Sequence, residues 1–224
     1  MKRRSPAVRA AALAVLALAV ATSPGVVAQA DPPEEVDQTL LVPTTLDSAF
    51  APFTCRLRST GPVCTGERHL DTGWVALDDF PCDEALHNRF VSDRWSTRYY
   101  DHDYLNYDRS VRSHDVDFFS TTPGGPATAT ITTRTRFFEP FAVPGDDSTR
   151  TIVTSGTIWD VRGAGGASLL RTVGTLVEPP GEVGTFTGHV TRDGVTTRYE
   201  DAPLDEASPE GELFATVCRA ATGG

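Results

Sequence analysis

Apolar and polar residues alternate with a period of two through most of the chain from Phe53 onward. The clearest run is 127–138, in which Ile131 falls among small or apolar residues on one face, while Arg134 and Arg136 lie among threonines on the other. Successive side chains of a β-strand point to opposite faces, so a period of two is typical of strands. This run therefore predicts a strand with one buried face and one face in water.

Similar runs recur along the chain and predict seven or eight strands. Asp193-Gly194 lies between two of these runs, and this dipeptide is a strong signal for a tight hairpin. No stretch keeps a 3.6-residue period over three turns, so we expect at most one helical turn, at residues 83–88. The expected strands are residues 89–100, 109–121, 127–138, 151–162, 168–177, 184–191, 195–202 and 213–219.

Short strands separated by turn signals indicate an all-β fold, either an antiparallel up-and-down barrel or a β-sandwich. The expected inward faces are rich in alanine, threonine, serine and glycine, and small inward residues leave room at the centre. We therefore favour a calycin-like barrel with an interior cavity over the sandwich. In the strand at 151–162 the residues expected to face inward are Val153, Ser155, Thr157, Trp159 and Val161.

The first thirty residues have the pattern of a secretory signal peptide. Basic residues precede an apolar run at 10–21 that is too short to span a bilayer, and Ala28-Gln29-Ala30 supplies the small residues that signal peptidase needs. We expect a secreted, extracellular protein. The predicted organisation is a signal peptide at 1–30, a flexible acidic tail at 31–50, one disulfide-tied β domain at 51–219 and a disordered C-terminus at 220–224.

Charge narrows the set of partners. Cleavage after Ala30 removes four basic residues and no acids, so the formal net charge falls from −10 to −14. An acidic protein repels nucleic acid and anionic lipid headgroups, so we expect neither a nucleic-acid nor a membrane partner. Residues 31–224 contain no lysine, which excludes Schiff-base catalysis through a side-chain amine.

An even number of cysteines in an oxidising compartment predicts disulfides. The four cysteines allow three pairings, of which we favour Cys55 with Cys64 and Cys82 with Cys218. The first pair closes a short loop that contains a Gly-Pro turn. The second ties the start of the main β domain to its last expected strand. A zinc site is disfavoured because no Cys-x-x-Cys pair occurs.

No catalytic residue, cofactor or metal site is predicted. The chain lacks a Gly-x-Ser-x-Gly elbow. Glycosidase chemistry needs two carboxylates, for which Asp78, Asp79 and Glu139 are the first candidates, but this requirement is too weak to discriminate. The densest group of potential metal ligands lacks the glycine and final glutamate of a calcium loop, so we interpret it as a solvated hairpin tip followed by an exposed strand face. The group consists of Asp101, His102, Asp103, Asp108, His114, Asp115 and Asp117.

Four residues are candidates for ligand binding. Trp159 and Trp95 are suited to lining an apolar pocket, with a place in the core as the alternative. Arg134 and Arg136 share a strand face and are spaced to hold a carboxylate or phosphate between them. Their alternative role is cross-strand pairing with acids on a neighbouring strand.

Several short motifs, in this order, resemble a group of secreted proteins from high-GC Gram-positive bacteria whose function is not established. They are Phe80-Pro81-Cys82, the Thr- and Ala-rich strand at 127–136, the segment from Gly156 to Gly174, and Cys218. The resemblance covers roughly residues 78–219 and implies a small exported β-barrel-like domain with an early and a late cysteine. It assigns no catalytic residue.

Together these observations favour a secreted, non-catalytic, monomeric protein that binds a small molecule or a component of a cell surface. One alternative is a barrel-type cyclase or hydrolase that uses carboxylates at the mouth of its cavity. Another is an envelope or partner-binding protein that uses its edge strands.

Overall fold

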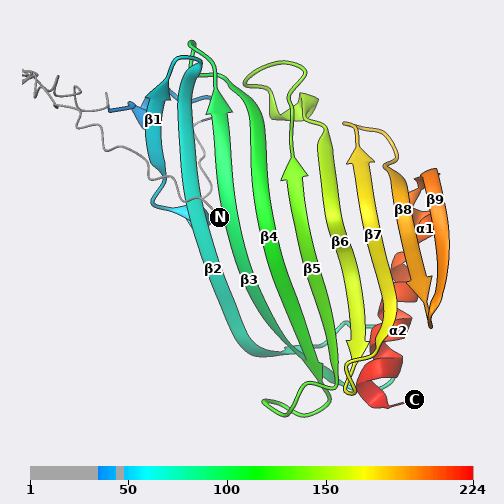
Figure 1. Cartoon of the computed structure of the whole chain (residues 1–224). Coiled ribbons are helices and arrows are strands. Elements are labelled where there is room, and N and C mark those ends of the chain that lie inside the picture. Colours follow the sequence, from blue (N-terminus) through cyan, green and yellow to red (C-terminus); the bar gives the residue numbers. More distant parts are fainter. Residues whose placement is uncertain (1–34, 44–47, 224) are drawn as a thin grey trace, which may run out of the picture. The chain divides into compact units, whose positions relative to one another are not determined.

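The computed structural model describes residues 35–43 and 48–223, so the expected signal peptide lies outside the described residues. Within them, nine strands form one sheet whose order follows the chain, and every neighbouring pair is antiparallel (Figure 1). The strands are β1 (Thr54–Arg58), β2 (Gly61–Leu77), β3 (Leu86–Tyr100), β4 (Asn106–Ser120), β5 (Ala129–Phe138), β6 (Ile152–Gly163), β7 (Ser168–Glu178), β8 (Thr185–Arg192) and β9 (Val195–Pro203). The helices are α1 (Leu204–Ala207) and α2 (Glu210–Thr222), with short 3-10 turns η1 (Gln38–Leu40), η2 (Ser48–Phe50) and η3 (Asp147–Thr149).

The all-β class and the up-and-down order predicted from the sequence are confirmed. The β8–β9 hairpin turns at Asp193 and Gly194, whose φ angles of 46° and 83° are those that a tight hairpin of this kind requires. Barrel closure is not seen, because β1 and β9 form the two edges of the sheet and do not pair with each other in the described part of the chain.

The expected last strand, at 213–219, is wrong. These residues belong to α2, in which Leu213, Val217 and Ala221 recur at four-residue spacing and are buried. Pro209 precedes the first turn, and Gly223 ends the helix in the left-handed conformation with φ 78°. The chain that was expected to extend the sheet therefore folds onto one of its faces instead.

Two smaller expectations near these segments are also corrected. The C-terminus is ordered as far as Gly223, because Ala221 lies in α2 and is only 4% exposed. Residues 83–88 contain no helical turn, and Leu86 already begins β3 and is buried in the core.

Helix α2 packs against β4 to β7 on one side of the sheet, which we call the helix face (Figure 1). The opposite side is the open face. The main core lies between α2 and the helix face, where burial of apolar side chains supplies the main stabilisation. It contains Leu86, Phe119, Ala129, Ile131, Ile158, Val161, Leu170, Phe186, Val190 and Ala207 together with the buried residues of α2.

Of the five residues of β6 that were expected to face inward, two do so and three do not, because this strand has a β-bulge. Thr132 and Arg134 of β5 pair with Asp160 and Thr157 of β6, so one residue of β5 faces two of β6. Trp159 and Val161 consequently lie on the helix face as expected. The residues before the bulge, Val153, Ser155 and Thr157, lie on the open face.

The segment before β1 is not a free tail in its described part. Val36, Leu41 and Phe50 are buried and form a second cluster with Phe53 and Tyr100. These apolar residues are interspersed among the acids and prolines that suggested flexibility, and their burial anchors the segment to the end of the helix face formed by β2 and β3.

Both predicted disulfides, Cys55–Cys64 and Cys82–Cys218, are confirmed. The first joins the paired strands β1 and β2. The second ties the connection between β2 and β3 to α2 rather than to a strand. It therefore holds α2 on the sheet by a covalent bond.

Replacing Cys82 and Cys218 together by serine should lower the free energy of unfolding by about 5 kcal/mol, because that bond closes a loop between residues 136 positions apart. The matched control is the Cys55 and Cys64 pair, which is nine positions apart and should cost about 3 kcal/mol. Urea denaturation of the two double variants measures both values. Equal losses would contradict the loop-length argument.

Candidate functional site

Two pockets lie beside α2 on the helix face, and both are bordered by Trp159 and Leu213. The larger, which we call the helix-start pocket, has a volume of about 590 Å³. The smaller, which we call the Asp117 pocket, has a volume of about 310 Å³. They exist because α2 covers only part of the face.

The Asp117 pocket is mainly aromatic and aliphatic. The Phe80 ring lies 5.7 Å from that of Phe119 and 5.2 Å from that of Phe214, measured between ring centroids. Three polar residues interrupt this apolar lining: Asn88, Asp117 and Thr133. The Thr133 hydroxyl is engaged, since it donates to the Ile158 carbonyl oxygen at 2.9 Å. Asn88 and Asp117 are therefore the groups that can recognise a polar atom in this pocket.

Asp117 is the one acidic residue in the lining of this pocket, and its side chain is half-buried. Burial raises the pKa of its carboxyl, and the neighbouring Asp115 raises it further, although a hydrogen bond from Asn88 acts in the opposite direction. The Asn88 Nδ2 donates to Asp117 Oδ1 at 3.0 Å. A cationic or hydrogen-bonding ligand group beside this carboxyl would replace part of the solvation that it has lost.

The helix-start pocket has an apolar interior and an acidic rim. Trp159, Leu176, Val183, Leu204 and Leu213 supply apolar surface, and the acids of the rim are exposed. The Ser208 hydroxyl is already paired with that of Thr172 at 3.1 Å. The rim acids are Glu178, Asp205 and Glu210. Among the residues that line either pocket, none is an arginine, lysine or histidine.

The structure separates the four predicted binding residues. Trp159 lines both pockets, and it is the one candidate among the four that does. Trp95 is 45% exposed, and Arg134 and Arg136 are also exposed, all three on the open face. Of the four residues proposed from the sequence, one therefore lies in the pockets beside α2 and three lie on the open face.

The predicted acid candidates lie elsewhere. Asp78 and Asp79 are exposed in the connection between β2 and β3, and neither lines a pocket beside α2. Glu139 is paired with Arg150 at 3.0 Å. Asp117 was named only within the group of potential metal ligands. The period-two pattern of β4 predicts the face of the sheet on which Asp117 lies. The pocket itself could not be predicted, because it is formed by α2, about a hundred residues later in the chain.

The members of that group do not come together. Asp101 Oδ1 accepts the backbone N–H groups of Asp103 and Leu105 at 2.9 Å and thereby shapes the turn between β3 and β4. His114 and Asp115 are consecutive in β4 and therefore point to opposite faces. The expectation of an exposed strand face is wrong for Asp115, which is buried. In the described part of the chain, no three histidine, cysteine or acidic side chains are grouped so that they could hold a metal ion.

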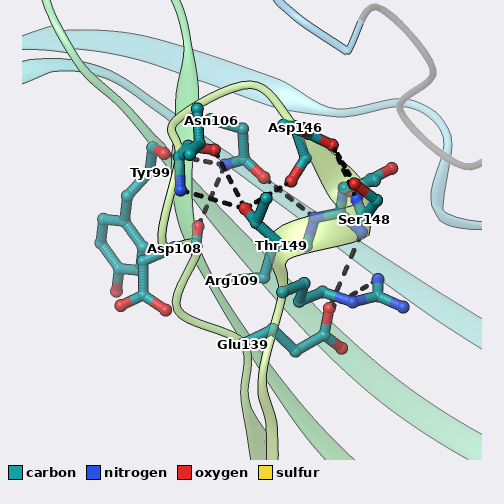
Figure 2. A network of polar contacts seen from close by, with 11 residues as sticks. Tyr99, Asn106, Asp108, Arg109, Glu139, Asp146, Ser148 and Thr149 are labelled. Carbon is teal, nitrogen blue, oxygen red and sulfur yellow. Dashed lines mark hydrogen bonds and ion pairs between the residues drawn. The ribbon is translucent and has the colours of Figure 1, made fainter. Parts of the chain in front are cut away.

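A buried polar network lies at the other end of β4 and is centred on Arg109 (Figure 2). The Arg109 guanidinium, only 8% exposed, donates to Asn106 Oδ1 at 2.9 Å and pairs with Asp147, while Glu139 lies 3.7 Å away. Asn106 in turn donates to the backbone carbonyls of Tyr99 and Asp108. These contacts fasten the β5–β6 connection to β4, so we assign the network a structural role.

Comparison of the chain with models of protein families, with curated proteins and with solved structures finds no match. None of the described helices is long and apolar enough to cross a membrane.

Replacing Arg109 by methionine should lower the free energy of unfolding by about 1 to 3 kcal/mol, because the buried Asn106 Oδ1 would lose its donor and Asp147 its cationic partner. The matched control is Arg112→Met in the same strand. Arg112 is exposed, so its replacement should change stability by less than about 0.5 kcal/mol. Chemical denaturation of both variants measures the difference, and similar losses would show that the network is not centred on Arg109.

Asp117→Asn should be more stable than the wild type, by an amount that grows as the pH rises from 3.8 through the raised pKa of Asp117. The folded protein holds the Asp117 proton more tightly than the unfolded chain does, so wild-type stability falls across that window, and asparagine removes this penalty. Denaturation at a series of pH values measures the difference between the two proteins.

Asp115→Asn provides a control of opposite sign. Burial opposes ionisation of Asp115, but hydrogen bonds from Arg94, Ser92 and Ser113 outweigh it and lower its pKa. The loss of stability in this variant should therefore be largest near neutral pH and shrink as the pH falls below 3.8. A pH-independent difference for either variant would contradict the assigned environments.

Proposed function

We propose that this chain is a secreted binding protein that holds a small amphiphilic molecule beside α2, with an apolar body and a cationic or neutral polar head. The observation that carries the proposal is a pair of adjoining apolar pockets whose charged residues are all acidic. The signal-peptide pattern and the two disulfides support an extracellular location.

The size and lining of the pockets support a small molecule as the ligand. Volumes of about 310 and 590 Å³ lie within the range of roughly 300 to 1,000 Å³ that is common for small-molecule sites. Such sites combine mainly apolar walls with a few polar groups that fix orientation, and the walls formed by Trp159 and Leu213 beside Asn88 and Asp117 fit this description. Burial of the ligand's apolar surface would supply most of the affinity.

The acidic residues of the two pockets support a cationic rather than an anionic head group. Asp117 faces the smaller pocket, while Glu178, Asp205 and Glu210 surround the larger. With no basic residue in either lining, an anionic head would be repelled at both positions. A cationic head would be attracted, by a few tenths of a kcal/mol up to about 1 kcal/mol for each exposed carboxylate.

Decyltrimethylammonium should therefore bind about tenfold more tightly than decyl sulfate, a probe with the same alkyl chain and the opposite charge, because 1.4 kcal/mol corresponds to a tenfold change. Isothermal titration calorimetry below the micelle concentration of each probe measures both affinities. Equal affinities, or a preference for the sulfate, would contradict a site selective for cations.

Trp159→Ala should weaken binding of decyltrimethylammonium by about tenfold, since it removes the aromatic wall shared by both pockets. Trp95→Ala is the matched control, because Trp95 is exposed on the open face and should leave this affinity unchanged. If the two variants behave alike, the ligand does not occupy the pockets beside α2.

One observation favours a second candidate, a cyclase or hydrolase that uses a carboxylate beside the cavity. The raised pKa of Asp117 in an apolar pocket is typical of acids that exchange protons with a substrate. Native mass spectrometry of protein purified from its own culture would identify a retained molecule. Conversion of that molecule by the wild type and not by Asp117→Asn would favour catalysis over binding.

A further inference from the structure

The open face carries a row of one aromatic and two basic residues across three neighbouring strands. The register places Trp95 of β3 opposite Arg112 of β4, and Arg112 opposite Arg136 of β5. In the next row, Arg134 of β5 lies opposite His114 of β4. We call Trp95, Arg112, Arg134 and Arg136 the arginine patch.

Cross-strand pairing with acids, the alternative role of Arg134 and Arg136, is not seen. Arg136 lies between Arg112 and Ser155, and Arg134 lies between His114 and Thr157. Across the described residues, no ion pair involves any of the three arginines of the patch. Like charges directly opposite each other, as Arg112 and Arg136 are, destabilise a sheet, and no acid lies directly opposite any of the three arginines. A bound anion would offset the repulsion.

The spacing of the patch suits several anionic groups on one chain. Neighbouring strands lie about 4.8 Å apart, and alternate residues of a strand about 7 Å apart, so the three arginines cover a span of roughly 5 to 10 Å. The Arg136 guanidinium lies 4.3 Å from the centroid of the Phe138 ring, which holds it against the sheet. Guanidinium groups bind carboxylates with two parallel hydrogen bonds.

A hollow of about 570 Å³ adjoins the patch at Trp95. Its lining includes the exposed threonines Thr54 and Thr65 and the carboxylate of Glu67, which can hydrogen-bond to hydroxyl groups. Trp95 is 45% exposed, and its indole offers a flat apolar surface on which a sugar ring can pack. An aromatic wall among hydroxyl-binding groups fits a carbohydrate better than a purely apolar ligand.

We propose that the arginine patch and this hollow bind an acidic polysaccharide, that is, a sugar chain bearing carboxylate groups. One sugar ring packs on Trp95, and the carboxylates of neighbouring units pair with Arg112, Arg134 and Arg136. A DNA strand is disfavoured, because its backbone offers no free hydroxyl groups to the threonines and the Glu67 carboxylate of the hollow, whereas every unit of a sugar chain does. This site is separate from the pockets beside α2 and does not depend on them.

Linear polygalacturonate is the probe, and its methyl ester is the matched ligand because it keeps the sugar chain and removes the charge. Calorimetric titration at low ionic strength should show the ester binding at least about tenfold more weakly. Arg134→Gln with Arg136→Gln should weaken binding of polygalacturonate by about tenfold or more, and Trp95→Ala should weaken binding of both forms.

Arg171→Gln with Arg198→Gln is the matched protein control. Both are exposed arginines, on β7 and β9, and their replacement changes the net charge by the same amount. This control and Trp159→Ala should leave the affinity for polygalacturonate within about twofold of the wild type. Circular dichroism of each variant verifies that the sheet is retained.

Three results would overturn the proposal. The first is absent or equal binding of polygalacturonate and its ester. The second is an equal loss in the two double arginine variants, which would reflect net charge alone. The third is tighter binding of a single-stranded oligodeoxynucleotide than of polygalacturonate, which would assign the patch to nucleic acid. None of these results bears on the pockets beside α2, because those are tested with different probes and with Trp159.

Discussion

The packing of α2 against the sheet is the contact on which the rest of this structure depends. An open sheet has no second sheet to cover its apolar side, and here Phe119, Ile131 and Val161 would face water without Leu213 and Val217 of the helix. The helix is narrower than the sheet, so the same packing that closes the core leaves pockets beside α2. Core and candidate site therefore arise from one contact, which the long-range disulfide holds in place.

The opposite end of the helix face is stabilised by arginines stacked on aromatic rings. Arg68 lies 5.4 Å from the centroid of Phe50, and Arg109 lies 5.0 Å from that of Phe141. Guanidinium groups suit this role because they stack on rings while pairing with carboxylates, as Arg109 does with Asp147. Buried arginines thus belong to structural networks, whereas the three arginines of the patch on the open face have no acidic partner across the described residues.

Local patterns predicted most of the sheet. Period-two alternation located the strands from β3 to β9, the Asp193-Gly194 turn located the last hairpin, and turn chemistry with cysteine spacing gave both disulfides. The sequence did not predict α2, because its buried apolar residues are only Leu213, Val217 and Ala221, and the run at 213–219, taken alone, is short enough to fit a strand. Nor did it predict the neighbours of Arg136 or the pocket at Asp117, since both depend on residues distant in sequence.

Register decides which chemistry appears on which face, and β5 and β6 show how narrowly it is set. Successive residues of β5 serve different surfaces, with Thr133 in the Asp117 pocket and Arg134 in the arginine patch, so a slip of one residue would exchange them. Opposite Thr133, the bulge in β6 moves Trp159 onto the helix face, although regular alternation from Thr157 would place it on the open face. Gly156 permits the close approach before the bulge, since its φ is 129° and a Cβ there would lie 2.2 Å from the Arg134 carbonyl oxygen. The bulge and the glycine therefore keep Trp159 in the wall of the pockets beside α2 and off the face that carries the arginine patch.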